Sequence, residues 1–126
     1  MKFSKFYFSL TISIIFFLTT LAAEAFHIQV FSTLTSSIDC EGWIIDPDSY
    51  KVVYDTGGKN CTGTCQLIDY NSPPPNGKFR VQIYEYKIGK DVDGDQDTCY
   101  EMSGTESSWD FNVVDCNKFS GVSPCN

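Results

Sequence analysis

The sequence predicts an all-β domain, a small disulfide-stapled β-sandwich or barrel of six to seven mostly antiparallel strands. Three observations predict this class. Apolar and polar residues alternate along several short segments, as they do in half-buried strands. Turn-forming Gly, Pro, Asn and Asp separate these segments at close intervals. After residue 25, no segment shows the spacing of apolar residues by three and four that a helix requires.

Residues 1–25 have the pattern of a secretory signal peptide. Basic residues precede an apolar run over residues 10–21, and residues 23–25 form a small-x-small cleavage pattern. The apolar run is short for a membrane span, and no other run of spanning length follows it. The sequence therefore predicts secretion without a membrane anchor, and a single disulfide-stabilised β domain over residues 26–126.

Several strands are predicted in the first half of this domain. They cover residues 26–34, the two arms of a hairpin over residues 42–54, and residues 65–70. In the first strand Phe26, Ile28 and Val30 share one face. The hairpin turns at Pro47, whose ring fixes φ, between aspartates that can bind local backbone amides. The prolines at 73–75 cannot donate ladder hydrogen bonds and therefore predict an exposed loop.

Residues 78–88 predict the central strand of the sheet. Phe79, Val81 and Ile83 point to one side, because successive side chains of a strand alternate between its faces. The opposite face carries Arg80, Gln82, Tyr84 and Tyr86. Tyrosine and arginine are enriched at interfaces because they combine a large contact area with a polar tip. These residues are the predicted binding face, unless a second sheet covers them and makes them part of the core.

Shorter elements are predicted after the central strand. An acidic hairpin tip is expected over residues 91–97. Two strands are expected over residues 98–102 and 109–113, and a tail over residues 117–126. Trp109, Phe111 and Val113 alternate with polar residues and therefore share one face. The tail is expected to be tied down by Cys125.

The cysteines predict disulfides rather than free thiols or a zinc site. All six follow residue 25: Cys40, Cys61, Cys65, Cys99, Cys116 and Cys125. An even number in a small secreted domain is typical of a disulfide framework, in which each bridge adds about 2–4 kcal/mol. Cys61 and Cys65 do not have the Cys-x-x-Cys spacing of redox enzymes. Many pairings are possible, and the sequence does not select one.

The chain is acidic. Its formal net charge is −7, and it becomes −8 without the predicted signal peptide, which carries two lysines and one glutamate. Phosphate groups are bound by clustered lysines and arginines, and no such cluster occurs in this sequence. The predicted partners therefore include neither nucleic acid nor anionic membrane surfaces.

The sequence offers little for catalysis, and it predicts no cofactor. Nucleophilic catalysis needs an imidazole to accept a proton, and the one histidine, His27, lies in the first predicted strand. We interpret it as an exposed or structural residue. With Arg80 as the one arginine, a ribonuclease-like scaffold would be inert. Two carboxylates about 5–10 Å apart could still hydrolyse glycosides, and the many acidic residues leave this alternative open.

The acidic stretch resembles a calcium loop superficially. Its aspartates are Asp91, Asp93, Asp95 and Asp97. An EF-hand loop needs glycine at its sixth position and glutamate at its twelfth, where this chain has Gln96 and Met102. The stretch is therefore predicted to be a solvated hairpin tip, with a weak Ca²⁺ site as the alternative.

Asn60 begins a glycosylation sequon that ends at Thr62. It lies in a glycine-rich segment where a glycan could be accommodated. A disulfide at Cys61, the middle residue, would restrict access to it. Glycosylation of Asn60 is therefore a prediction that competes with disulfide formation.

A signal-peptide pattern, a small acidic domain, six cysteines and strand patterning occur together over the whole chain. In this architecture the protein resembles the small secreted cysteine-rich proteins of filamentous fungi, many of which are effector candidates. It differs from hydrophobins and CFEM proteins in its number of cysteines, and it lacks the Tyr-x-Cys motif of mildew ribonuclease-like effectors. The resemblance implies a non-enzymatic binding protein that acts on a host or competitor protein or glycan. A small carbohydrate-active hydrolase and a toxin or antimicrobial protein are the alternatives.

Overall fold

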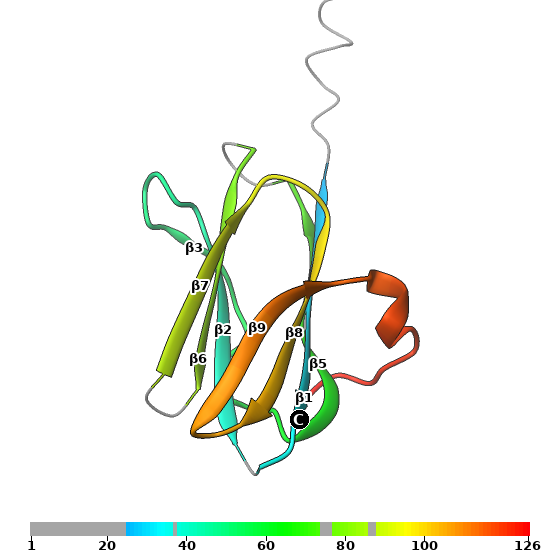
Figure 1. Cartoon of the computed structure of the whole chain (residues 1–126). Coiled ribbons are helices and arrows are strands. Elements are labelled where there is room, and N and C mark those ends of the chain that lie inside the picture. Colours follow the sequence, from blue (N-terminus) through cyan, green and yellow to red (C-terminus); the bar gives the residue numbers. More distant parts are fainter. Residues whose placement is uncertain (1–24, 37, 74–76, 86–87) are drawn as a thin grey trace, which may run out of the picture.

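Two β-sheets pack face to face in the computed structural model, which describes residues 25–36, 38–73, 77–85 and 88–126 (Figure 1). The strands are β1 (Phe26–Leu34), β2 (Asp39–Ile45), β3 (Val52–Asp55), β4 (Lys59–Asn60), β5 (Gly63–Ser72), β6 (Phe79–Glu85), β7 (Ile88–Gly94), β8 (Thr98–Thr105) and β9 (Ser108–Val114), followed by the 3-10 helix η1 (Cys116–Phe119). The predicted all-β class is confirmed as a sandwich. Within the described residues the sheets do not close into a barrel.

The strand order is β5-β1-β8-β9 in the four-stranded sheet and β3-β2-β6-β7 in the five-stranded sheet, where β4 also pairs with β2. Only the β1–β8 pair is parallel among the described strands, so the predicted antiparallel character is confirmed. β2 and β3 form the predicted hairpin. β6 lies between β2 and β7, which confirms that the predicted central strand is internal to its sheet.

The predictions need three corrections in the second half of the chain. The central strand was expected to run to residue 88, but β6 ends at residue 85 and residue 88 belongs to β7. The acidic stretch was expected to be a hairpin tip, but most of it belongs to β7, which pairs with β6. Asp91 and Asp93 alternate with Val92, so the carboxylates face outward while the valine packs against the core. The predicted tail begins with η1, in which Phe119 is buried and stacks on Phe31 with ring centroids 4.7 Å apart.

The core lies between the two sheets. The inward residues of β6, Phe79, Val81 and Ile83, are fully buried, as their alternation predicts. Ile28 and Val30 of β1 meet them from the other sheet as members of the same cluster. Close packing of such side chains is the main stabilising term of a domain this small.

All six cysteines form disulfides, as predicted, with the pairs Cys40–Cys61, Cys65–Cys125 and Cys99–Cys116. Such a set indicates an oxidising environment. The predicted signal peptide lies outside the described residues. Within them, no helix is long and apolar enough to cross a membrane.

Gly94 ends β7 against the buried ring of Phe79. A Cβ at this position would lie 2.5 Å from Phe79 Cζ, well inside van der Waals contact. We expect Gly94→Ala to lower the free energy of unfolding by at least about 1 kcal/mol, because the packed ring has to move. Gly89→Ala is the control in the same strand, since its Cβ would meet Tyr84 at an ordinary 3.5 Å. Equal losses in urea unfolding for the two variants would contradict this account.

Candidate functional site

The candidate site is the outward face of the five-stranded sheet, that is, the side that points away from the four-stranded sheet. β6 contributes Arg80, Gln82 and Tyr84, three of the predicted binding residues. Strand register places Trp43 of β2 and Asp91 of β7 on either side of Gln82. Tyr86, the fourth predicted residue, lies outside the described residues. Tyr84 remains 45% exposed, because the other sheet packs against the opposite face.

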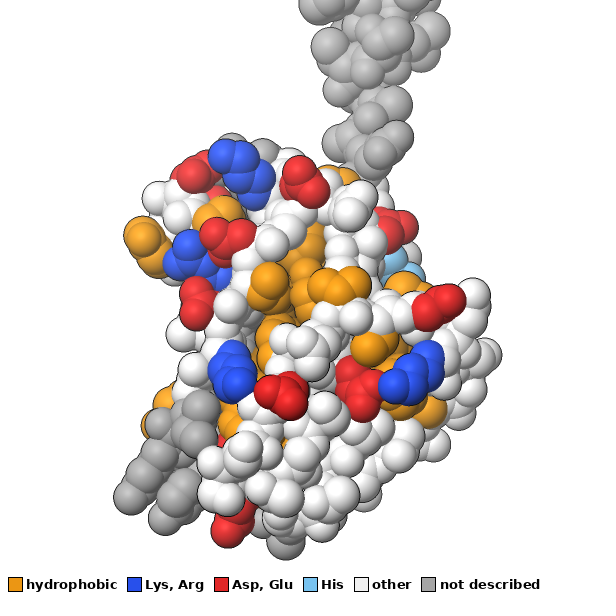
Figure 2. Space-filling model, in the orientation of Figure 1, with side chains coloured by type: hydrophobic (Ala, Val, Ile, Leu, Met, Phe, Trp, Pro, Cys, Tyr) orange, Lys and Arg blue, Asp and Glu red, His pale blue; other side chains and the backbone are white. Residues whose placement is uncertain are grey.

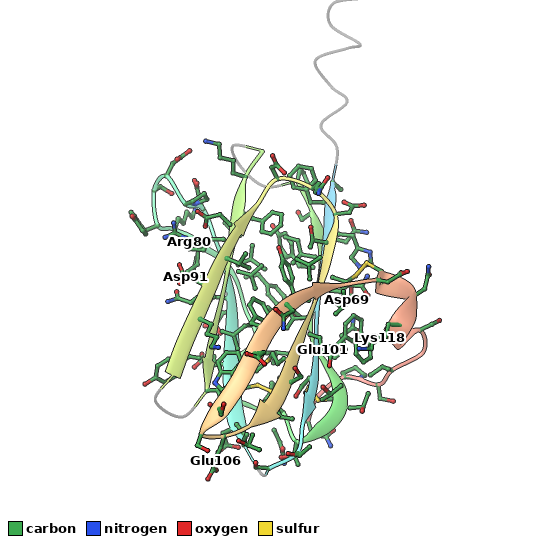
Figure 3. The ribbon with its side chains drawn as sticks, in the orientation of Figure 1. Asp69, Arg80, Asp91, Glu101, Glu106 and Lys118 are labelled. Atoms are coloured by element: carbon green, nitrogen blue, oxygen red, sulfur yellow. A yellow bond between two sulfur atoms is a disulfide. The ribbon has the colours of Figure 1, made fainter. Side chains whose placement is uncertain are left out.

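Arg80 is held in place by carboxylates of β7 (Figure 3). Its Nε and Nη2 donate to Asp93 Oδ1 at 2.7 Å and Oδ2 at 3.2 Å, and its Nε lies 3.7 Å from Asp91. The hydrogen bond and the charge of the guanidinium lower the pKa of Asp93. A bidentate pair fixes the plane of the guanidinium, although such a surface ion pair adds little stability.

Tyr50 brings a second exposed ring to Arg80. The guanidinium carbon lies 5.7 Å from its ring centroid, within cation–π range. Tyr50 has φ of 58°, a left-handed conformation that is uncommon for a residue other than glycine. Asp46 supports this turn, because its carboxylate accepts hydrogen bonds from the Asp48 amide at 3.1 Å and the Ser49 hydroxyl at 2.9 Å. The fold thus holds an aromatic ring in solvent at some conformational cost.

Exposed hydrophobic surface gathers on this sheet. Of the four large hydrophobic side chains that are exposed among the described residues, Tyr50, Val52 and Tyr84 belong to the five-stranded sheet or its β2–β3 turn. The sequence predicted Tyr84 from its alternation. It did not single out Tyr50. The turn signal at Asp46 and Pro47 predicts a turn before Tyr50, but the exposure of the ring follows from the left-handed backbone, which the sequence does not predict.

Two hollows flank the middle of β6. One has a volume of about 480 Å³ and is lined by Pro47, Asp48, Lys78, Arg80, Asp93, Gly94 and Asp95. The other has a volume of about 230 Å³ and is lined by Asp39, Cys40, Glu41, Gly58 and Tyr84. The first is lined mostly by charged or polar residues, unlike the mostly apolar pockets that bind small molecules. The second is smaller, and its exposed lining is mainly apolar.

A carboxyl pair lies across the β2–β3 hairpin. Glu41 is two residues from Trp43, whose cross-strand partner is Asp55. Desolvation, and then the hydrogen bond and charge of Asp55, raise the pKa of Glu41. The nearby Asp55 carboxyl thus favours the protonated form of Glu41. The sequence contained no signal for this pair, because it depends on strand register.

The four aspartates of the weak Ca²⁺ site, the alternative interpretation of the acidic stretch, lie within the described residues and do not form a metal-binding group. Asp91 and Asp93 face Arg80, and Asp97 accepts the backbone amide of His27 at 3.0 Å. Within the described residues, no group of three or more His, Cys, Asp or Glu side chains is placed to hold a metal ion. The histidine side chain pairs with Asp69, with 2.6 Å between Nε2 and Oδ1.

The sequon residues take part in local hydrogen bonds. Asn60 is exposed, and its Oδ1 accepts the Thr62 amide at 2.9 Å. The Thr62 hydroxyl accepts the Ile38 amide at 3.0 Å. Glycosylation of Asn60 stays a prediction.

Glu85 was missed by the sequence analysis and is fully buried. Neither of its carboxyl oxygens, nor the buried Nε1 of Trp109, has a hydrogen-bond partner within the described residues. Burial, and then the charge of Glu106, raise the pKa of Glu85, while the Trp109 indole acts in the opposite direction. The alternation of β6 carried the signal, since Glu85 shares the inward face of Phe79, Val81 and Ile83.

Comparison with protein-family models, curated proteins and solved structures finds no match to this chain. The function is therefore argued from the geometry of the site.

Proposed function

We propose that the protein is a secreted, non-enzymatic binding protein, effector-like in its action on a host or competitor target. The observation that carries the proposal is the pair of exposed rings, Tyr50 and Tyr84, at 70% and 45% exposure on the side of the sheet that holds Arg80. Exposed aromatic rings on one face of a sheet, with polar residues around them, are typical of interaction sites.

The chemistry of this face fits macromolecular recognition. Tyrosine and arginine contribute a disproportionate share of binding energy at protein interfaces. Arg80 is fixed by Asp93 and Tyr50, so less side-chain entropy is lost when a partner docks. The open, charged hollow beside it favours a protein or glycan surface over a small buried ligand.

Secretion is part of the proposal. The amino-terminal pattern of residues 1–25 and the three disulfides both support it. Disulfides persist in oxidising compartments such as the extracellular space. The partner of a protein secreted there would be an extracellular protein or glycan.

The alternative is a small carbohydrate-active hydrolase, and Glu41 with Asp55 is the pair that favours it. The raised pKa of Glu41 is what a general acid requires. Retaining hydrolases hold their carboxyls about 5 Å apart and inverting ones farther, on the two sides of a cleft, whereas these two carboxyls come from adjacent strands of one sheet face. Carbohydrate binding without hydrolysis therefore fits this face better than catalysis does.

The test compares two surface variants with the wild-type domain. Tyr84→Ser removes one exposed ring, and Tyr50→Gly removes the other while it relieves the left-handed backbone. Each domain is immobilised and exposed to the extracellular proteins of a candidate host and to a panel of glycans. We expect each substitution to weaken binding of the captured partner by about thirtyfold, which is typical of a hot spot.

Thr64→Ala is the matched control, because Thr64 is exposed on the four-stranded sheet. It should retain the partner as the wild type does. A partner that binds both tyrosine variants and the wild type equally would refute this face as the binding site. Cleaved glycans in the panel, lost with Glu41→Gln, would establish the hydrolase instead.

A further inference from the structure

The geometry points to a second interaction surface, the free edge of β9, which fits an extended peptide segment of a partner protein with alternating apolar and basic side chains. Such a segment would add as a further strand beside β9. This inference is independent of the proposed function, because it concerns the other sheet.

The two edges of the four-stranded sheet differ. The β5 edge is covered by the carboxyl-terminal segment, since the Gln66 amide donates to the Ser123 carbonyl and the Cys125 amide to the Gln66 carbonyl, both at 2.9 Å. Within the described part of the chain, no strand pairs with the second edge of β9. An uncovered edge is a template for pairing with another strand.

The backbone groups that point to this edge can be assigned. The Met102 carbonyl accepts the Thr33 hydroxyl at 3.3 Å and the Gly104 carbonyl accepts the Thr35 amide at 3.0 Å, so both point toward β1 rather than β9. In antiparallel pairs, residues whose groups point away from the partner strand alternate with residues that bond to it. The β9 partners of Met102 and Tyr100 are Phe111 and Val113, whose amides and carbonyls therefore face the free edge.

Lys90 gives an independent check and marks one end of the edge. Its Nζ donates to the Trp109 carbonyl at 2.5 Å and lies 4.9 Å from the Trp109 ring centroid. The Trp109 carbonyl thus also points away from β8, as the same alternation requires. Lys90 belongs to β7, the edge strand of the other sheet, so the free edge beyond Trp109 faces the space between the two sheets.

Side chains beside this edge are apolar on the inner side. Phe111 stacks on Tyr100 with centroids 5.0 Å apart, Val113 is 67% exposed, and Val92 of β7 packs against the core. Figure 2 shows apolar side chains in the hollow between the two edges. Alternate apolar side chains of an added strand would enter this hollow, because they would point to the same side as Phe111 and Val113.

The outer side of the edge selects the charge of the partner. Asp110 and Asn112 face outward, and Asp115 follows β9 directly. The Asp110 side chain has no hydrogen bond or ion pair with any described residue. Basic side chains of an added strand would lie beside these carboxylates. A second copy of the chain would instead bring net charges of −7 together, so charge favours a basic partner over self-association.

The probe is a labelled peptide as long as β9 that alternates lysine and valine, with a peptide alternating glutamate and valine as its counterpart. Fluorescence anisotropy should show that the lysine peptide binds at least about tenfold more tightly than the glutamate peptide. Asp110→Lys should abolish or invert that preference. Tyr84→Ser should leave it unchanged, which separates this inference from the proposed function.

Val113→Pro tests the edge itself. Proline is tolerated where the amide faces away from the partner strand, and it removes a donor that an added strand needs. We expect the lysine peptide to bind at least about tenfold more weakly to this variant, while Val113→Thr binds as the wild type does. Thermal unfolding of Val113→Pro verifies that the domain is folded.

Three results of the peptide-binding experiments would overturn the inference. They are equal binding of the lysine and glutamate peptides, absence of binding by both, and undiminished binding by folded Val113→Pro. A concentration-dependent dimer in sedimentation that Val113→Pro abolishes would also overturn it, because the occupant of the edge would then be a second copy of this chain.

Discussion

Replacing Cys65 and Cys125 together by alanine is expected to lower the free energy of unfolding by about 4 kcal/mol. The pair is 60 residues apart, so its bridge closes the longest loop of the three disulfides. In the chain-entropy account a bridge restricts the unfolded chain more as its loop lengthens. A domain of this size has a total stability of roughly 5–15 kcal/mol, so the loss is a large fraction of it.

The bridge also holds the segment that covers the β5 edge. Beyond the two hydrogen bonds of Gln66, the Asn60 amide donates to the Asn126 carbonyl at 2.7 Å. Without the disulfide these bonds open locally, and the β5 edge becomes available for pairing. In this double variant, hydrogen exchange should therefore accelerate at the amides of residues 66 and 125 before it does in the core strands.

The matched control is Cys99→Ala with Cys116→Ala. This pair is 17 residues apart, and its loss should cost about 3 kcal/mol on the same account. Urea unfolding of both double variants, with the slope of each fitted separately, gives the comparison. If the two double variants lose the same free energy, or the shorter loop costs more, loop length does not govern these bridges.

The sequence could predict this fold because its main signals are local. Alternation in residues 78–88 predicted that Phe79 and Val81 point inward. It also predicted that Arg80 and Tyr84 point outward, and the structure confirms both. The acidic run was misassigned because four charges in seven residues outweighed the weaker alternation of Asp91, Val92 and Asp93. Their charges are accommodated on the outward face by Arg80, a contact that depends on strand pairing.

The features that were missed are those that depend on tertiary structure. The disulfide partners follow from which strands are adjacent, and Cys65 with Cys125 could not be paired from sequence spacing alone. The exposure of Tyr50 follows from its left-handed backbone, which the presence of a tyrosine at this position does not predict. The Glu41 and Asp55 pair needs the β2–β3 register. Of the candidate site, alternation therefore predicted the β6 residues and little else.

Glu85→Met is expected to raise the free energy of unfolding by about 1–4 kcal/mol at pH 7 to 8. The carboxyl is fully buried, and its oxygens have no hydrogen-bond partner within the described residues. Replacing a buried ionisable group by an apolar side chain of similar volume removes the cost of desolvation and keeps the core filled. Methionine also adapts to the space between Trp109 and its neighbours.

The pH dependence of this gain identifies its cause. Burial raises the pKa of Glu85 in the folded protein above its ordinary value of 4.5. Below that value the carboxyl is protonated in both states, so ionisation costs nothing. As pH rises from 4.5 toward the raised pKa, the unfolded state releases its proton while the folded state keeps it, so the loss accumulates in this interval and is complete above it. The wild type therefore loses stability with rising pH from this group, and the difference between Glu85→Met and wild type grows.

Asp93 has the opposite effect, because its pKa is lowered in the folded protein and its carboxylate therefore stabilises the fold at a pH above its ordinary pKa. This contribution is the same in both proteins, so it cancels when the difference between them is measured at each pH. Glu106, in the turn between β8 and β9, raises the pKa of Glu85 by its charge. In a Glu106→Gln background the gain from Glu85→Met should therefore be smaller at pH 7 to 8 and unchanged at low pH. A gain that is the same at every pH would show that packing alone, and not the buried charge, separates the two proteins.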